Sequence, residues 1–264
     1  MNASNNRILL IDSGIGGLSI FNELTTQLPF LSIDYFCDHA FFPYGNKELS
    51  TLVTRVHDIV ENCLQKHSYD LAVIACNTAS TVVLPSLRSS FDIPFVGVVP
   101  AIKPACALSL TRQVGLLATE GTVTREYTHN LIKEFACDAE LTLVGCAELV
   151  KEAEKKLAGK PVDLEVLKQV IAPFKAKNVD TIVLGCTHFP WLVEELASVI
   201  EWPVKWVDSG KAIAARVESL LNDQASHLLD RSAAQYRFYT SGACSDIHLD
   251  HLPMDFTLIE SFQV

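Results

Sequence analysis

The sequence has no apolar run approaching the roughly 20 residues that a membrane-spanning helix needs, and it is short of basic residues. Lysine and arginine number 21 against 31 aspartates and glutamates, which gives a formal net charge of −10. This charge argues against a nucleic acid or an anionic membrane as partner, because phosphate binding needs a basic surface. Met1 to Arg7 is polar and leads directly into an apolar strand, so we expect no signal peptide and a cytoplasmic protein.

The sequence also lacks any CxxC pair, although it contains eight cysteines. None of their spacings fits a zinc module, so we expect no metal site. In a reducing cytosol most of them are expected to be small buried residues, as for Cys63 and Cys106 within helical patterns. Cys76 and Cys186 differ, because each follows an apolar run and precedes polar residues. The full set is Cys37, Cys63, Cys76, Cys106, Cys137, Cys146, Cys186 and Cys244.

A nucleotide-binding fingerprint is missing as well. The glycine-rich turn over 12–17, Asp-Ser-Gly-Ile-Gly-Gly, has neither the GxGxxG spacing nor a Walker lysine. Asp12 at the end of the predicted strand would also repel a phosphate. The turn instead suits the approach of backbone N–H groups to a small ligand, with Asp12 and Ser13 as side-chain contacts. The alternative is that Asp12 caps the following helix.

Two matching stretches organise the predicted fold: Val-Ile-Ala-Cys-Asn-Thr over 73–78 and Val-Leu-Gly-Cys-Thr-His over 183–188. Each is typical of a buried strand that ends at a small residue and a cysteine, with a helix beyond it. Ligands of open α/β sheets bind at such carboxyl ends of strands. Pro94 and Pro203 follow the two cysteines at nearly the same interval. We therefore expect an internal repeat.

Strands and helices alternate along the whole sequence, which indicates parallel, helix-covered sheets. We expect an α/β fold of two pseudo-symmetric domains with the active site in the cleft between them. The first domain would comprise residues 1–98 plus 209–264, and the second residues 99–208. We also predict a helix opened by residues 121–124, a helix over 191–200 and a polar linker over 222–232.

Two thiols that face each other could act in three ways. No CxxC motif supports a redox disulfide, and two cysteines alone are too few ligands for a metal. The third way places them on opposite faces of one carbon, where one thiolate removes a proton and the other thiol delivers one. This is inversion of configuration by general acid–base catalysis without a cofactor. A thiolate at a helix N-terminus is stabilised by the helix dipole and the N–H groups.

The side chains that flank the cysteines fit this chemistry. Asn77, Thr78 and Thr187 can donate hydrogen bonds to a carboxylate. Asp12 lies at a neighbouring strand end, and His188 lies two residues from Cys186. We expect these two side chains to assist proton transfer. The alternative is that His188 is a structural residue behind the site, with its hydrogen bonds satisfied by the protein.

Five motifs together closely resemble the glutamate racemase family, of the aspartate/glutamate racemase superfamily. They are Ile-Asp-Ser-Gly-Ile-Gly-Gly over 11–17, Pro-Tyr-Gly over 43–45, Ala-Cys-Asn-Thr-Ala over 75–79, Gly-Cys-Thr-His-Phe-Pro over 185–190 and Val-Asp-Ser-Gly over 207–210. The resemblance implies a cofactor-independent isomerase that supplies D-glutamate for peptidoglycan, and thus for cell-wall biogenesis and cell shape. It implies that Cys186 takes the proton from L-glutamate and Cys76 from D-glutamate.

The resemblance also implies the remaining site residues. A glutamate in the helix after Cys146 would assist catalysis; Glu154 matches best, and Glu148 and Glu152 are the alternatives. The implied catalytic set is Cys76, Cys186, Asp12, His188 and Glu154. The implied substrate contacts are Asp12, Ser13, Tyr44, Gly45, Asn77, Thr78, Thr119, Thr122, Thr187 and His188.

Partners and competing functions stay open at this point. The segment over 145–150 is similar to the proteobacterial branch, some members of which need a peptidoglycan precursor as activator, and family members are often homodimers. One alternative function is a related racemase acting on aspartate or a hydantoin. Another is a non-catalytic protein that binds a small molecule, which would leave the paired cysteines unexplained.

Overall fold

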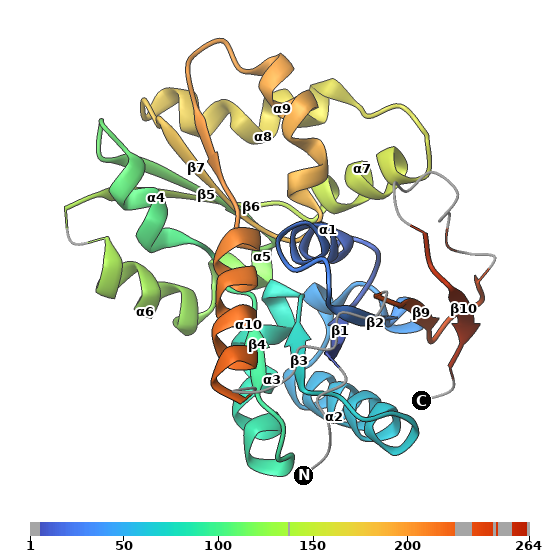
Figure 1. The fold of residues 1–264 in the computed structure, drawn as a ribbon. Helices are drawn as coiled ribbons and strands as arrows, with labels where there is room; N and C mark the ends of the chain where they lie inside the picture. Colours follow the sequence, from blue (N-terminus) through green and yellow to red (C-terminus); the bar gives the residue numbers. More distant parts are fainter. Residues whose placement is uncertain (1–5, 137, 225–233, 245–246, 248–254, 263–264) are drawn as a thin grey trace. The chain divides into compact units, whose positions relative to one another are not determined.

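The computed structural model describes residues 6–136, 138–224, 234–244, 247 and 255–262 of the 264-residue chain. This part of the chain divides into two compact units, one formed by residues up to 98 and from 210 onward, the other by residues 99–209 (Figure 1). Each unit has a parallel sheet with helices, so the predicted α/β class is confirmed. We keep as a proposal the predicted division into two domains, residues 1–98 plus 209–264 and residues 99–208.

A six-stranded parallel sheet forms the first unit, in the order β10-β9-β2-β1-β3-β4. Its central strands are apolar and almost wholly buried, as expected of strands covered on both faces. The carboxyl ends of β1 and β3 lie side by side, because these strands pair in parallel. The strands are β1 (Arg7–Asp12), β2 (Ser32–Cys37), β3 (Leu71–Ile74), β4 (Phe95–Gly97), β9 (Tyr236–Thr240) and β10 (Leu258–Ser261).

The helices of the first unit are amphipathic. In α2 the buried side chains Leu52, Val56, Ile59, Val60 and Cys63 form one stripe, which packs in the same core as β1 and β3. The predicted linker over 222–232 was wrong at its start, since α10 continues to Gln224; residues 225–232 lie outside the described residues. The helices are α1 (Leu18–Gln27), η1 (His39–Phe41), η2 (Tyr44–Asn46), α2 (Leu49–Lys66), α3 (Asn77–Ser90) and α10 (Gly210–Gln224).

The sheet of the second unit repeats part of the first. Its order is β6-β5-β7-β8, which corresponds strand for strand to β2-β1-β3-β4. Cys76 therefore follows the third strand of one series and Cys186 follows the third strand of the other. The strands are β5 (Gln113–Ala118), β6 (Glu140–Gly145), β7 (Thr181–Gly185) and β8 (Lys205–Val207).

Two predicted helices of the second unit differ in the structure. The helix after Cys186 is not continuous over 191–200, because a 3₁₀ segment that includes Pro190 precedes the short α-helix. The helix opened by residues 121–124 stops after one turn, because Arg125 adopts an extended backbone. The helices are α4 (Ile102–Leu108), α5 (Glu120–Val123), α6 (Glu126–Phe135), α7 (Glu148–Leu157), α8 (Leu164–Ala176), η3 (Phe189–Leu192) and α9 (Val193–Val199). Among the helices in the described part of the chain, none combines the length and apolar character needed to cross a bilayer.

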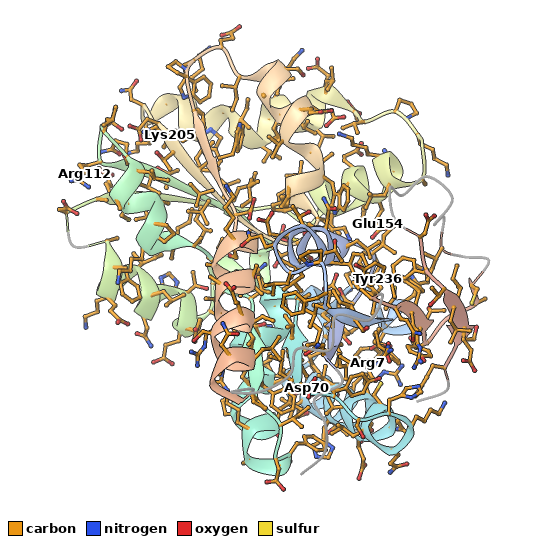
Figure 2. The ribbon with its side chains drawn as sticks, viewed as in Figure 1. Arg7, Asp70, Arg112, Glu154, Lys205 and Tyr236 are labelled. Carbon is orange, nitrogen blue, oxygen red and sulfur yellow. The ribbon has the colours of Figure 1, made fainter. Side chains whose placement is uncertain are left out.

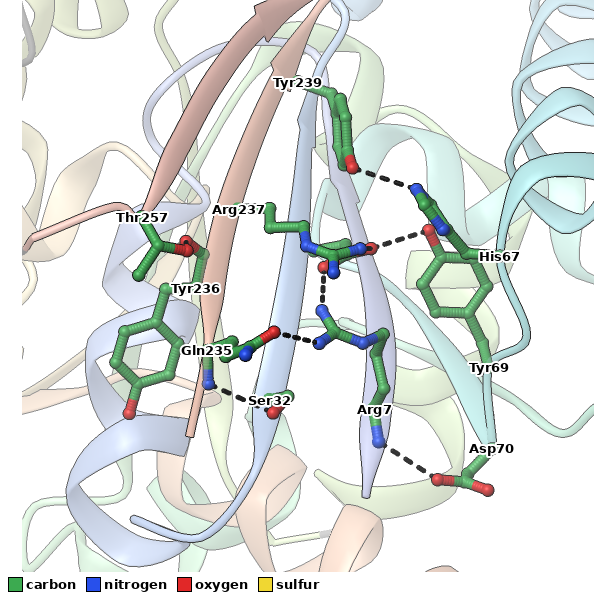
Figure 3. A network of polar contacts seen from close by, with 11 residues as sticks. Arg7, Ser32, His67, Tyr69, Asp70, Gln235, Tyr236, Arg237, Tyr239 and Thr257 are labelled. Carbon is green, nitrogen blue, oxygen red and sulfur yellow. Dashed lines mark hydrogen bonds and ion pairs between the residues drawn. The ribbon is translucent and has the colours of Figure 1, made fainter. Parts of the chain in front are cut away.

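A polar network joins the late strand β9 to β1 and β2 in the first unit (Figure 3). The Asp34 carboxylate has no exposed surface, forms an ion pair with Arg7, and accepts a hydrogen bond of 2.9 Å from Tyr69 Oη. Arg237 Nη1 lies 3.8 Å from the same carboxylate. Arg7 Nη2 also donates to Gln235 Oε1 at 3.1 Å, although these residues are 228 positions apart. The network therefore joins the segment around β9, near the end of the sequence, to the first strand.

Candidate active site

Cys76 is held where β3 meets α3. It adopts an extended backbone, and the helix begins at the next residue. Ser80, on the first turn of α3, donates from Oγ to Ile74 O at 2.8 Å and accepts from Val98 N at 3.0 Å. One buried hydroxyl thus joins the ends of β3 and β4 to the helix. Cys76 is 8% exposed and is therefore almost buried.

Asp12 ends β1, the strand beside β3, and is fully buried. Its Oδ2 accepts a hydrogen bond of 2.8 Å from Gly17 N, at the start of α1. A Cβ on Gly17 would lie 2.7 Å from Asp12 Cβ, so a glycine is required there. Gly17, and not Asp12, occupies the N-cap position of α1, so this bond closes the turn between β1 and the helix. Ser13 is buried next to Asp12.

Tyr44 belongs to a buried cluster that the sequence did not predict. Its Oη donates to Asp38 Oδ2 at 2.8 Å. Arg55 donates to both oxygens of Asp38, at 3.1 and 2.7 Å, and Ser241 Oγ donates to Oδ1 at 2.6 Å. Burial raises the pKa of Tyr44 well above its ordinary value, and negative charge on Asp38 and Cys76 raises it further. Tyr44 therefore stays protonated near the thiol.

The two residues after Cys76 are also buried. Asn77 and Thr78 are 4% and 3% exposed. Among the described residues, Asn77 Oδ1 has no hydrogen-bond partner. Because buried carbonyl oxygens are almost always paired, this oxygen is suited to accept a hydrogen bond from a bound ligand.

Cys186 follows β7 directly, and its environment differs from that of Cys76. His188 turns back toward it, so that Cys186 Sγ lies 3.9 Å from His188 Nδ1. On the other side of the ring, His188 Nε2 lies 2.6 Å from Glu154 Oε1. The histidine is 2% exposed. The three side chains therefore form a thiol–imidazole–carboxylate chain within the second unit.

The charge around His188 favours its protonated form. Burial lowers the pKa of His188, but the contacts to Cys186 and Glu154 outweigh burial and raise it well above its ordinary value. A carboxylate only accepts hydrogen bonds, so the neutral imidazole carries its proton on Nε2. Nδ1 is then free of a proton and can accept the one on Cys186. The arrangement is suited to convert the thiol into a thiolate beside an imidazolium.

The structure separates the three glutamates that the sequence left as alternatives. Glu154, labelled in Figure 2, belongs to α7, and its Oε1 atom contacts His188. Glu152 is buried, but its carboxylate accepts from Lys155 Nζ at 2.6 Å and from Asp163 N at 2.8 Å. Glu148 is exposed at the first residue of the helix. Glu154 is thus the glutamate positioned to act on the histidine.

We expect Glu154→Gln to lower the pKa of His188, because the neighbouring negative charge is lost. A raised histidine pKa stabilises the folded state below about pH 6.5, the unfolded value. That contribution disappears as the pH rises through the folded pKa. The stability difference between wild type and Glu154→Gln should therefore be largest in acid and shrink at alkaline pH. Urea unfolding at several pH values and NMR titration of His188 test this, with Glu152→Gln as the matched control that leaves the His188 titration unchanged.

Three threonines complete the predicted set in the second unit. Thr119 follows β5, the strand paired with β7, and its Oγ1 lies 3.0 Å from that of Thr122. Thr128 Oγ1 donates to Thr122 O at 2.6 Å and fixes that turn. Thr187, between the cysteine and the histidine, is 4% exposed. Hydroxyl groups therefore gather at the carboxyl ends of two neighbouring strands.

The predicted site residues fall into one set in each unit. The first unit holds Asp12, Ser13, Tyr44, Gly45, Cys76, Asn77 and Thr78, and the second holds Thr119, Thr122, Glu154, Cys186, Thr187 and His188. Among the described residues, His57, Asp58 and Glu61 form a group that could hold a metal ion. They lie on α2, and none of them belongs to either set.

Known proteins are similar to this chain in sequence and in fold. A model of the Asp/Glu/hydantoin racemase family matches residues 16–217. The glutamate racemase of Vibrio vulnificus is 51% identical over 223 residues, 84% of each chain. The structure of Escherichia coli glutamate racemase with L-glutamate and the activator UDP-MurNAc-Ala is 43% identical, with a TM-score of 0.89 over 98% of both chains. That of the Francisella tularensis enzyme with D-glutamate is 27% identical, with a TM-score of 0.82 over 98% of both.

The chain therefore belongs to the Asp/Glu/hydantoin racemase family. Within that family, the three compared proteins are all glutamate racemases. The resemblance inferred from the five sequence motifs is thus confirmed.

Proposed function

We propose that the protein is a glutamate racemase, which interconverts L- and D-glutamate through two thiols and without a cofactor. The observation that carries the proposal is the chain of Cys186, His188 and Glu154 at the end of β7, together with a second thiol, Cys76, at the equivalent strand end. Glutamate, rather than aspartate or a hydantoin, is favoured by the relatives, which are glutamate racemases at up to 52% identity.

In the proposed reaction, His188 first accepts the proton of the Cys186 thiol. The resulting thiolate removes the α-proton of L-glutamate, and the electron pair of the broken C–H bond stays on Cα. The Cys76 thiol then donates its proton to the opposite face of this carbanion, which gives D-glutamate. The reverse reaction exchanges the roles of the two thiols, so the enzyme returns to its starting state after one turnover in each direction.

The difficulty of this reaction is the weak acidity of the α-proton, which is far below that of a thiol. Preorganised hydrogen-bond donors stabilise the charge that develops on the substrate. We assign this task to the hydroxyl groups of Thr78, Thr119 and Thr187, which would hold the carboxylates. The Asn77 Oδ1 atom would accept a hydrogen bond from the substrate ammonium. Each tenfold gain in rate requires about 1.4 kcal/mol of such stabilisation.

Incubation of the purified protein with L-glutamate in deuterium oxide tests the activity. We expect circular dichroism to decay toward zero as D-glutamate forms, and NMR to show deuterium at Cα. The same assay with L-aspartate and with a hydantoin should show no comparable change. Deuterium exchange on L-aspartate alone would indicate the related racemase, and binding of glutamate without exchange would indicate a binding protein.

The partners and location remain proposals. The Escherichia coli structure includes UDP-MurNAc-Ala as an activator, and we propose that a peptidoglycan precursor of this kind also raises the activity of this chain. Supply of D-glutamate to peptidoglycan follows from the proposed reaction. A homodimer and a cytoplasmic location stay predictions from the sequence.

A further inference from the structure

The loop after β2 places Tyr44 in the same buried cluster as Cys76, where charge on the Cys76 thiol acts on the tyrosine. Tyr44 and Cys76 are 1% and 8% exposed. Phe41 packs edge-on against Tyr44, with ring centroids 6.2 Å apart. The Arg55 guanidinium lies 5.8 Å from the centroid of the same Phe41 ring. Arg55 of α2 therefore contacts the loop at Phe41 and also forms an ion pair with Asp38.

The buried Asp38 carboxylate decides the direction of every hydrogen bond around it. A carboxylate accepts only, so Arg55, Ser241 and Tyr44 must each donate to it. The Tyr44 hydroxyl therefore donates its proton to Asp38, and the Tyr44 oxygen can accept a hydrogen bond from another group. Arg55 forms an ion pair with this buried carboxylate and supplies its counter-charge.

Ser241 fixes the beginning of the same loop. Its hydroxyl donates to Asp38 Oδ1 at 2.6 Å and accepts from Ala40 N at 3.1 Å. Ser241 is 203 positions from Asp38 along the sequence. The loop is thus held at Ala40 by Ser241 and at Tyr44 by Asp38.

We propose that Arg55 is a positioning residue for the reaction, which acts through Asp38 to fix the Tyr44 hydroxyl oxygen as a hydrogen-bond acceptor beside Cys76. This inference rests on the proposed function in that Cys76 is taken as a reacting thiol. Without Arg55, the buried Asp38 carboxylate loses its counter-charge and the two hydrogen bonds that hold it in place. Asp38 then shifts, and Tyr44 is released from its orientation.

A double-mutant cycle between Arg55 and Tyr44 tests the proposal. Displacement of a group in a reacting site by about 1 Å can cost roughly 10²-fold in rate, so we expect Arg55→Gln to lower kcat between about 10- and 100-fold. The substitution Tyr44→Phe keeps the ring and removes the hydroxyl. In that background Arg55→Gln should lower kcat less than about threefold, because the link to Asp38 is already absent. Arg55→Lys should recover part of the loss.

Control variants separate positioning from a general effect. Lys168→Gln also removes one positive charge, from an exposed ion pair on α8, and should leave kcat unchanged. Circular dichroism and thermal unfolding establish the folded fraction of each variant. An equal loss of kcat in both Tyr44 backgrounds, or an unchanged kcat in Arg55→Gln, would overturn the proposal.

Alkylation of the thiols gives a second measurement that does not depend on turnover. Iodoacetamide labelling of Cys76 and Cys186 is followed by mass spectrometry of the separate peptides. Release of Tyr44 should speed labelling of Cys76 at least threefold in Arg55→Gln, with Cys186 as the internal reference, and the acceleration should be absent in the Tyr44→Phe background. A wild type that fails to racemise glutamate would refute the proposed function, whereas unchanged labelling of Cys76 would refute the role of Arg55.

Discussion

Replacement of either thiol, by Cys76→Ala or Cys186→Ala, should lower kcat for glutamate racemisation by about 10²–10⁴-fold, the range in which a positioned acid or base contributes. Each variant keeps one side chain that can handle a proton on one face of Cα and loses the other. Cys76 and Cys186 are nearly buried, at 8% and 9% exposure, and alanine is smaller than cysteine, so it introduces no clash. We therefore expect the fold to be retained. Polarimetry of L- and D-glutamate and far-ultraviolet circular dichroism make the comparison.

Cys63→Ala provides the matched control for these variants. Cys63 is buried in α2, and burial raises the pKa of its thiol to about 12, so it cannot supply a thiolate near neutral pH. This variant should lose some stability and keep its turnover. Near-normal turnover in Cys76→Ala or Cys186→Ala would refute the two-thiol mechanism.

Asp34→Ala should lower the free energy of unfolding by about 3–5 kcal/mol, the usual cost of removing one partner from a buried ion pair. The substitution leaves the Arg7 guanidinium without its buried counter-charge and the Tyr69 hydroxyl without its acceptor. Both consequences fall on the junction between β1, β2 and β9 rather than on the thiols. Urea unfolding followed by circular dichroism measures the loss.

The exposed pair of Asp138 and Arg112 offers the control for that measurement. Its oxygen and nitrogen lie 3.4 Å apart, and the Asp138 side chain is 66% exposed. Asp138→Ala removes the same kind of side chain from an aspartate–arginine pair and should cost less than about 1 kcal/mol. A similar cost for the two variants would mean that Asp34 contributes no more than a surface pair.

The fold class and the two thiols could be predicted because their signals are local. An apolar run that ends in a small residue and Cys76, or in Gly185 and Cys186, indicates a buried strand and marks its carboxyl end. The repeated interval to Pro94 and Pro203 then relates the two halves. The strand orders observed in the two sheets correspond in the same way.

The residues that escaped prediction are joined over long separations. Asp38, Arg55 and Ser241 meet from β2, α2 and the segment after β9, and their types are common on any protein surface. Nothing in their spacing distinguishes them from solvated charges. The beginning of the predicted helix over 191–200 was wrong for a different reason, since Pro190 favours a 3₁₀ turn that the hydrophobic pattern does not reveal.

The place of β9 in the sheet has a consequence for synthesis on the ribosome. Residues 113–207 provide all four strands of the second sheet in one continuous stretch, so that unit has its strands early. The edge of β2 that pairs with Tyr236 to Thr240 has no partner until those residues emerge. An unpaired edge of this kind invites association with other chains. During most of translation the nascent first unit therefore exposes this unpaired edge of β2, until β9 pairs with it.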